Sequence, residues 1–127
     1  MNFFKIYPEH RFIHTWTTGS DFDSLMEFYK EVSAHEDFSK DFVGLADMRE
    51  ASLEFSPEQA AMLARFVVEN DYTHSRWVFL ASEPSATALS LVYQNIVIKK
   101  HEIFVVSTIE AASEYLGINL KNIIENK

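Results

Sequence analysis

Polar and charged side chains follow two apolar segments of the sequence, where they could form a binding site. Asp47 and Arg49 follow the apolar run at 42–46, and Ser82 and Glu83 follow the run at 77–81. If these runs are parallel strands of an open α/β sheet, their carboxyl ends form the edge at which ligands bind. The sequence therefore predicts a polar binding site at these four residues. A surface ion pair or a turn-forming aspartate is the alternative.

Ser56 begins the clearest helix-start pattern in the chain. Ser56, Pro57 and Gln59 combine a capping hydroxyl, proline at the first helical position and glutamine at the third, which is the pattern of a capping box. A phosphate on Ser56 would also be stabilised by the amino end of a helix. The main prediction is a structural cap, and a phosphorylation switch that binds a partner is the alternative.

The residue inventory argues against several kinds of chemistry. The chain has no Cys, which excludes disulfides and thiolate chemistry. Its five His show no metal-ligand spacing, and no phosphate-binding glycine loop or nucleophile elbow occurs. His14 shares one side of a predicted strand with Phe12 and Trp16, so we expect it to be a packing residue. We therefore expect no metal, no cofactor and no enzymatic activity.

The charge balance argues against two classes of partner. Eleven basic and nineteen acidic residues give a formal net charge of −8, whereas nucleic acids and anionic membranes attract basic patches. The longest apolar stretches are far shorter than the roughly 20 residues that span a bilayer. The first ten residues also lack the pattern of a signal peptide. We expect a cytoplasmic protein that binds no nucleic acid and spans no membrane.

Two hydrophobic periodicities alternate along the 127 residues and predict the elements that position these side chains. Gly117 predicts the end of the last long helix. The pair Ser107 and Glu110 predicts a capping box at its start. The predicted strands are 3–7, 11–18, 42–46, 77–81 and 103–106, and the predicted helices are 22–34, 57–68, 84–98 and 108–116, with a short helix after 118.

This order predicts a single α/β domain over residues 1–127. Strands that alternate with helices need crossover connections, which give a mainly parallel sheet. The first two strands are separated by a short turn around Pro8 and should form an antiparallel hairpin. We therefore expect a sheet of four or five strands that is mainly parallel, with an N-terminal antiparallel strand and flanking helices.

Four phrases of the sequence resemble a known family. FVGLADMRE, LEFSPEQA, WVFLASEP and HEIFVVSTIEAASEYLGI together resemble the SpoIIAA-like, STAS-related small bacterial proteins, over roughly residues 3–118. The resemblance implies a SpoIIAA-like fold. Its founding relatives are anti-sigma-factor antagonists, which bind a partner protein and are switched by phosphorylation of a Ser, and other relatives bind lipids or small ligands. Ser56 falls near that switch position but lacks the Asp and Gly of the family's phrase.

These observations predict a non-enzymatic protein-interaction module with a regulatory role, acting through the helix at 57–68 and the loop at 47–56. The alternative is a carrier or sensor of a lipid or other small apolar ligand, bound beside the helix at 84–98. That helix is apolar around most of its circumference, which a surface helix does not need. The C-terminal segment, a second subunit or a ligand could cover it. We expect a homodimer with this helix or residues 118–124 in the interface.

Overall fold

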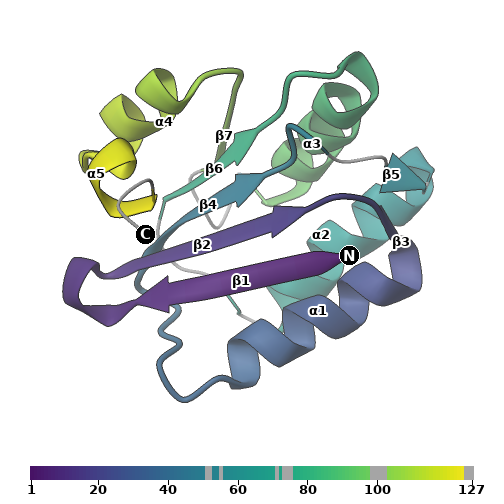
Figure 1. Ribbon diagram of the computed structural model, residues 1–127. Coiled ribbons are helices and arrows are strands. Elements are labelled where there is room, and N and C mark those ends of the chain that lie inside the picture. Colours follow the sequence, from purple (N-terminus) through teal and green to yellow (C-terminus); the bar gives the residue numbers. More distant parts are fainter. Residues whose placement is uncertain (51–52, 55, 71, 73–75, 98–102, 125–127) are drawn as a thin grey trace.

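The computed structural model describes residues 1–50, 53–54, 56–70, 72, 76–97 and 103–124, and these form an α/β domain (Figure 1). The order of strands and helices agrees with the order predicted from the sequence, apart from one small extra pair of strands. The elements are β1 (Asn2–Tyr7), the 3-10 turn η1 (Pro8–His10), β2 (Phe12–Thr17), β3 (Ser20–Asp21), α1 (Phe22–Ala34), β4 (Val43–Asp47), β5 (Leu53–Glu54), α2 (Pro57–Glu69), β6 (Trp77–Leu80), α3 (Pro84–Val97), β7 (Ile103–Val106), α4 (Ile109–Leu116) and α5 (Leu120–Ile124).

A five-stranded sheet with the order β1-β2-β4-β6-β7 forms the centre of the domain. The β1–β2 pair is antiparallel and the other three pairs are parallel, which confirms the predicted α/β class and its mainly parallel sheet. Each parallel strand lies beside the next one along the chain. Because crossovers of this kind are right-handed, all three connecting helices, α1 to α3, lie on one face. Helices α4 and α5 follow the last strand and cover the other face (Figure 1).

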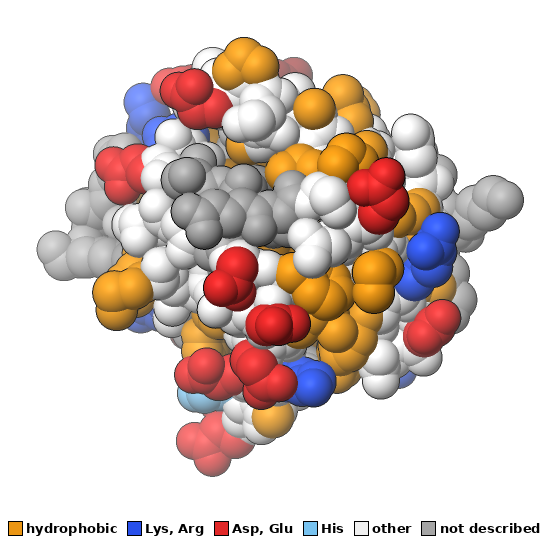
Figure 2. Space-filling model, turned by 90° about the vertical axis from the view of Figure 1, so that its right-hand side faces the viewer, with side chains coloured by type: hydrophobic (Ala, Val, Ile, Leu, Met, Phe, Trp, Pro, Cys, Tyr) orange, Lys and Arg blue, Asp and Glu red, His pale blue; other side chains and the backbone are white. Residues whose placement is uncertain are grey.

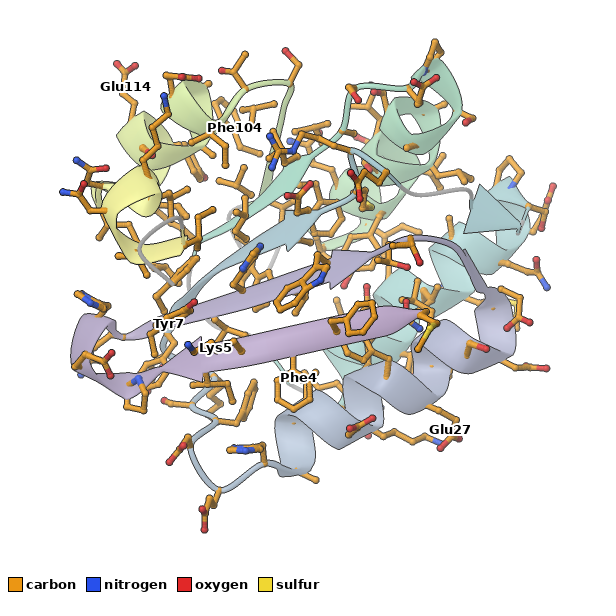
Figure 3. The ribbon with its side chains drawn as sticks, viewed as in Figure 1. Phe4, Lys5, Tyr7, Glu27, Phe104 and Glu114 are labelled. Carbon is orange, nitrogen blue, oxygen red and sulfur yellow. The ribbon has the colours of Figure 1, made fainter. Side chains whose placement is uncertain are left out.

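Alternating side chains along a strand supply the cores on the two faces of the sheet. In β6, Val78 and Leu80 belong to the core beneath α4 and α5, whereas Phe79 belongs to the core beneath α2 and α3. In Figure 3, Phe4 points from β1 toward α1, and Phe104 of β7 lies beside α4 on the opposite face. The sheet is therefore the middle of three layers.

Short polar side chains cap the beginnings of α1 and α4. Asp21 caps α1 by accepting a hydrogen bond of 2.8 Å from the backbone N–H of Ser24. The prediction of a capping box at Ser107 is wrong. The capping residue of α4 is Thr108, which accepts from the backbone N–H of Ala111 at 3.1 Å. Both hydroxyl residues can cap a helix, and the start is one residue later than the Ser107–Glu110 spacing suggests.

The described part of the C-terminal segment, up to Ile124, does not cover the apolar helix α3, as one of the alternatives required. Leu120 is fully buried in the core beneath α4 and α5, and Ile123 and Ile124 pack against that core. Helix α3 lies on the other face of the sheet, where Tyr93 is buried against α2 and the sheet. Its outer side remains exposed at Leu91, which keeps 45% of its accessible surface.

Candidate functional site

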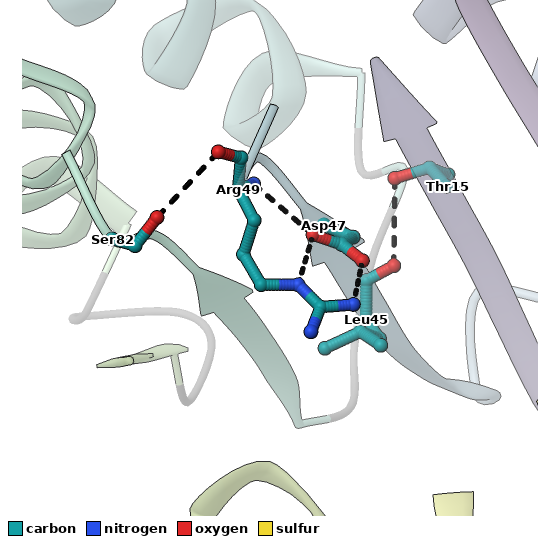
Figure 4. A network of polar contacts seen from close by, with 5 residues as sticks. All are labelled: Thr15, Leu45, Asp47, Arg49 and Ser82. Carbon is teal, nitrogen blue, oxygen red and sulfur yellow. Dashed lines mark hydrogen bonds and ion pairs between the residues drawn. The ribbon is translucent and has the colours of Figure 1, made fainter. Parts of the chain in front are cut away.

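The predicted polar site contains a bidentate ion pair at the end of β4. The Arg49 guanidinium donates to both carboxylate oxygens of Asp47, from Nε to Oδ1 at 3.0 Å and from Nη2 to Oδ2 at 2.7 Å (Figure 4). The backbone N–H of Arg49 also donates to Oδ1 at 3.1 Å. Asp47 is thus both an ion-pair partner and a turn-forming residue. These contacts agree with the alternative prediction of a surface ion pair and a turn-forming aspartate. Ligand binding at this pair stays a prediction.

Ser82 and Glu83 lie at the end of the neighbouring strand. The Ser82 hydroxyl donates to the backbone carbonyl of Arg49 at 3.5 Å (Figure 4), which brings Asp47, Arg49 and Ser82 into one network. Glu83 is exposed, and its backbone carbonyl accepts from the N–H and the hydroxyl of Thr87 in the first turn of α3. The four residues do share one edge of the sheet, as predicted.

Ser56 has a different role from these four residues. Its hydroxyl accepts from the backbone N–H of Gln59 at 3.2 Å, and the Gln59 side chain accepts from the backbone N–H of Ser56 at 3.0 Å. This reciprocal pair is the predicted capping box at the start of α2. The hydroxyl is therefore engaged in holding the helix end.

A cavity of about 110 Å³ lies between the sheet and the three helices on its first face. It is neither sealed nor a shallow surface depression, and its walls are almost entirely apolar. The cavity runs beneath the sheet from Thr17 and Asp47, at one end of the strands, to Trp77 and Ile103 at the other. The helices contribute Leu25 and Phe28 of α1, Leu63 and Val67 of α2, and Leu89 and Tyr93 of α3.

Two tyrosine side chains bring their hydroxyl groups together at the wall of this cavity. Tyr29 of α1 and Tyr93 of α3 both line it, and their buried hydroxyls are hydrogen-bonded to each other. Burial raises the pKa of Tyr29 to about 12, partly offset by the bond to Tyr93. Burial also raises the pKa of Tyr93 well above 10.0, and the proximity of Tyr29 adds to that rise. Both phenols are therefore neutral at physiological pH.

The sequence analysis predicted an apolar ligand site beside α3 only as an alternative, and it did not single out these tyrosines. Leu89, Ser90 and Tyr93 of α3 do border the cavity. A tyrosine at helical spacing is usually a core residue, so nothing local marked Tyr29 or Tyr93. The sequence feature that could have indicated the pair is the presence of two tyrosines, each with a polar hydroxyl group, on two helices that both pack against the sheet.

The surface around the carboxyl ends of the strands carries acidic side chains among hydrophobic and uncharged ones. Figure 2 faces the end of the molecule that carries β3 and β5, and shows acidic side chains around exposed hydrophobic ones. Among the described residues, no group of three or more His, Asp or Glu could hold a metal ion. No helix in the described part of the chain is both long and apolar enough to cross a membrane.

No family model, no curated protein and no solved structure matches the chain. The fold and the cavity therefore have to be interpreted from their own geometry. The resemblance to SpoIIAA-like proteins stays a prediction.

Proposed function

We propose that this protein binds one small, neutral, apolar molecule in the cavity between the sheet and helices α1 to α3, and that it acts as a sensor. The observation that carries the proposal is the cavity itself, with its apolar walls and its partial opening. Protein interiors are normally packed without voids larger than a water molecule. An apolar cavity of this size in the middle of a core costs stability unless something fills it.

The volume of the cavity supports a ligand with few heavy atoms. At about 110 Å³, it is somewhat smaller than a 150 Å³ apolar cavity that binds benzene, and smaller than the roughly 300–1,000 Å³ of drug-sized sites. A small ring or a short branched chain fits this volume. A long acyl chain would need the helices to separate, so the volume favours a small-molecule sensor over a lipid carrier.

The charges around the cavity support a neutral ligand. Among the described residues that line the cavity, Asp47 is the only charged one, and its carboxylate is already paired with Arg49. No described Lys or Arg side chain lines the walls, and the chain carries a net charge of −8. An anionic group such as a fatty-acid carboxylate would find no cationic partner among the described lining residues and would be costly to bury without one.

The position of the cavity connects this proposal with the expected regulatory module. Its helical walls, α2 and α3, expose apolar side chains on their outer sides, because Met62 and Leu91 keep 50% and 45% of their accessible surfaces. A ligand held between these helices and the sheet could change how they present that surface to a partner. The SpoIIAA-like fold, the protein-interaction role and the homodimer through α3 are retained as parts of this proposal.

The test uses two alanines of α2 that differ in their surroundings. Ala60 lines the cavity, whereas Ala64, one turn further along the helix, is fully buried and does not line it. Ala60→Leu should be tolerated and should abolish binding of benzene measured by NMR titration. Ala64→Leu should destabilise the fold by about 1–3 kcal/mol through overpacking. Failure of the unmodified protein to bind benzene or any co-purified small molecule would refute the proposal.

A further inference from the structure

One residue that lines the cavity carries a buried donor without a hydrogen-bond acceptor. The indole Nε1–H of Trp77 is shielded from solvent, and no described residue accepts its hydrogen bond. Leaving a buried polar group unsatisfied costs about 1–3 kcal/mol. Such groups are rare in native structures, and each one calls for an explanation such as an ordered water or a bound ligand.

Four other polar side chains around the cavity already form hydrogen bonds. The Ser90 hydroxyl donates to the Ala86 carbonyl at 2.7 Å, and the Ser33 hydroxyl donates to the Tyr29 carbonyl at 2.8 Å. The hydroxyls of Tyr29 and Tyr93 bond to each other. Among the described residues that line the cavity, Trp77 carries the one buried donor atom without a hydrogen-bond partner.

The indole ring is held where it is, so the N–H cannot turn to find another acceptor cheaply. Trp77 packs against both clusters beneath the helices, the one containing Ile13 and Phe28 and the one containing Leu63 and Phe79. Its ring also lies against Gly44 of the neighbouring strand, in the space that a side chain there would need. A donor fixed in this way is organised before any ligand arrives.

We propose that the ligand of this cavity carries a hydrogen-bond acceptor, such as a carbonyl or ether oxygen, which accepts from the Nε1–H of Trp77. This inference rests on the proposed function and narrows its ligand to small neutral ketones, ethers or esters with an apolar body. The apolar body fills the space between the helices, and the single oxygen meets the donor that the protein leaves unsatisfied. A plain hydrocarbon of the same shape would leave that donor unsatisfied.

The experiment compares two probes of the same shape, cyclohexanone and methylenecyclohexane, in which an oxygen replaces a CH₂ group. Dissociation constants are measured by NMR titration for the unmodified protein and for Trp77→Phe. The preference for the ketone over the alkene should fall about fivefold in Trp77→Phe, the value of one net hydrogen bond. Taking the ratio of the two probes removes the effect of the space that the smaller Phe ring opens.

Matched controls separate this inference from the proposed function. The chain has two Trp, and Trp16 also lines the cavity, so Trp16→Phe serves only to assign the two indole N–H signals. In the unmodified protein, the ketone but not the alkene should move the Trp77 N–H signal downfield. If neither probe binds, the proposed function fails. If both bind with a preference that Trp77→Phe leaves unchanged, the acceptor assignment is overturned, because a retained water or the Tyr29–Tyr93 pair then donates to the ketone in both protein variants.

Discussion

The indole ring of Trp77 occupies the space in which a side chain of Gly44 would lie. The two residues are partners in the β4–β6 register, and a Cβ atom on Gly44 would overlap the ring atoms Cε2 and Cδ2 of Trp77. Glycine is required here for the close approach of the ring. This contact fixes the floor of the cavity and the position of its free donor.

We predict that Gly44→Ala destabilises the protein by about 1–3 kcal/mol, the usual cost of overpacking a core. The added methyl group displaces the indole ring, so the fluorescence of Trp77 should change as well. Urea denaturation and emission spectra measure the two effects. Gly117 is the control, because its φ of 74° is left-handed and a Cβ there meets no neighbour within 4 Å. At position 117, Asn tolerates the left-handed φ, so Gly117→Asn should cost less stability than Gly117→Ala. At position 44 the space is the limit, so Gly44→Asn should cost at least as much as Gly44→Ala.

The cap of α4 gives a second prediction. Thr108→Ala should lower the free energy of unfolding by about 1 kcal/mol, because the N–H of Ala111 loses its acceptor. Ser107→Ala should have little effect. Ser56→Ala should cost about as much as Thr108→Ala, since Ser56 caps α2 in the same way. Thermal melts of the three variants measure the losses, and a larger loss at Ser107 would contradict the described helix start.

The paired tyrosines predict a loss of stability in alkaline solution. The folded-state pKa of Tyr29 is about 12, and that of Tyr93 is also raised, whereas both ionise near 10.0 in the unfolded chain. The folded state therefore holds more protons above pH 10, so their contribution is complete below pH 10 and is lost as pH rises toward 12. Urea denaturation across this range should show the fall. The Tyr29→Phe, Tyr93→Phe double variant should show a shallower one.

The homodimer prediction can now be tested with residues on opposite sides of the sheet. Leu91 is exposed on α3, whereas Ile124 packs against the core beneath α4. If α3 forms the interface, Leu91→Lys should halve the mass found by light scattering and leave the fold stable. Ile124→Lys should instead destabilise the fold, because a charge would enter a partly buried site. A monomeric mass for the unmodified protein would contradict the dimer.

The ion pair at the end of β4 predicts a small and unequal effect of its two residues. The Arg49 side chain is 44% exposed, and exposed ion pairs contribute about 0–1 kcal/mol. Arg49→Ala should therefore cost little. Asp47→Ala should cost more, because it also removes the acceptor of the Arg49 backbone N–H. Salt titration of the two stabilities distinguishes these contributions, since only the ion pair is screened.

The larger elements were predictable from local pattern because burial leaves its period in the sequence. The apolar run at 77–81 predicted a buried strand, and the described strand β6 is Trp77–Leu80. Ser56, Pro57 and Gln59 predicted the start of α2 because the capping box needs only neighbouring residues. The ladder of β3 with β5 was not predictable. Each strand has two residues, too few to show alternation, and Ser20 and Asp21 are turn-forming types.

The candidate site was predictable only in part, because it depends on contacts between distant parts of the chain. Asp47, Arg49 and Ser82 share an edge because parallel strands all end there, which the strand pattern implied. The cavity depends instead on how Trp77 meets Gly44 and how Tyr29 meets Tyr93. Each of these pairs joins two elements, and no local spacing records the distance between a helix and the sheet.

The covering of the second face by α4 and α5 has a consequence for how the protein is made. Phe12, Leu45, Val78 and Leu80 form that face, and all four precede the helices that cover them. As the ribosome releases the chain from its N-terminus, the sheet can assemble strand by strand with its first face already closed by α1 to α3. The opposite face stays uncovered until residues 109–124, which form α4 and α5, have emerged. A chain that stops before Thr108 should therefore depend on chaperones or aggregate.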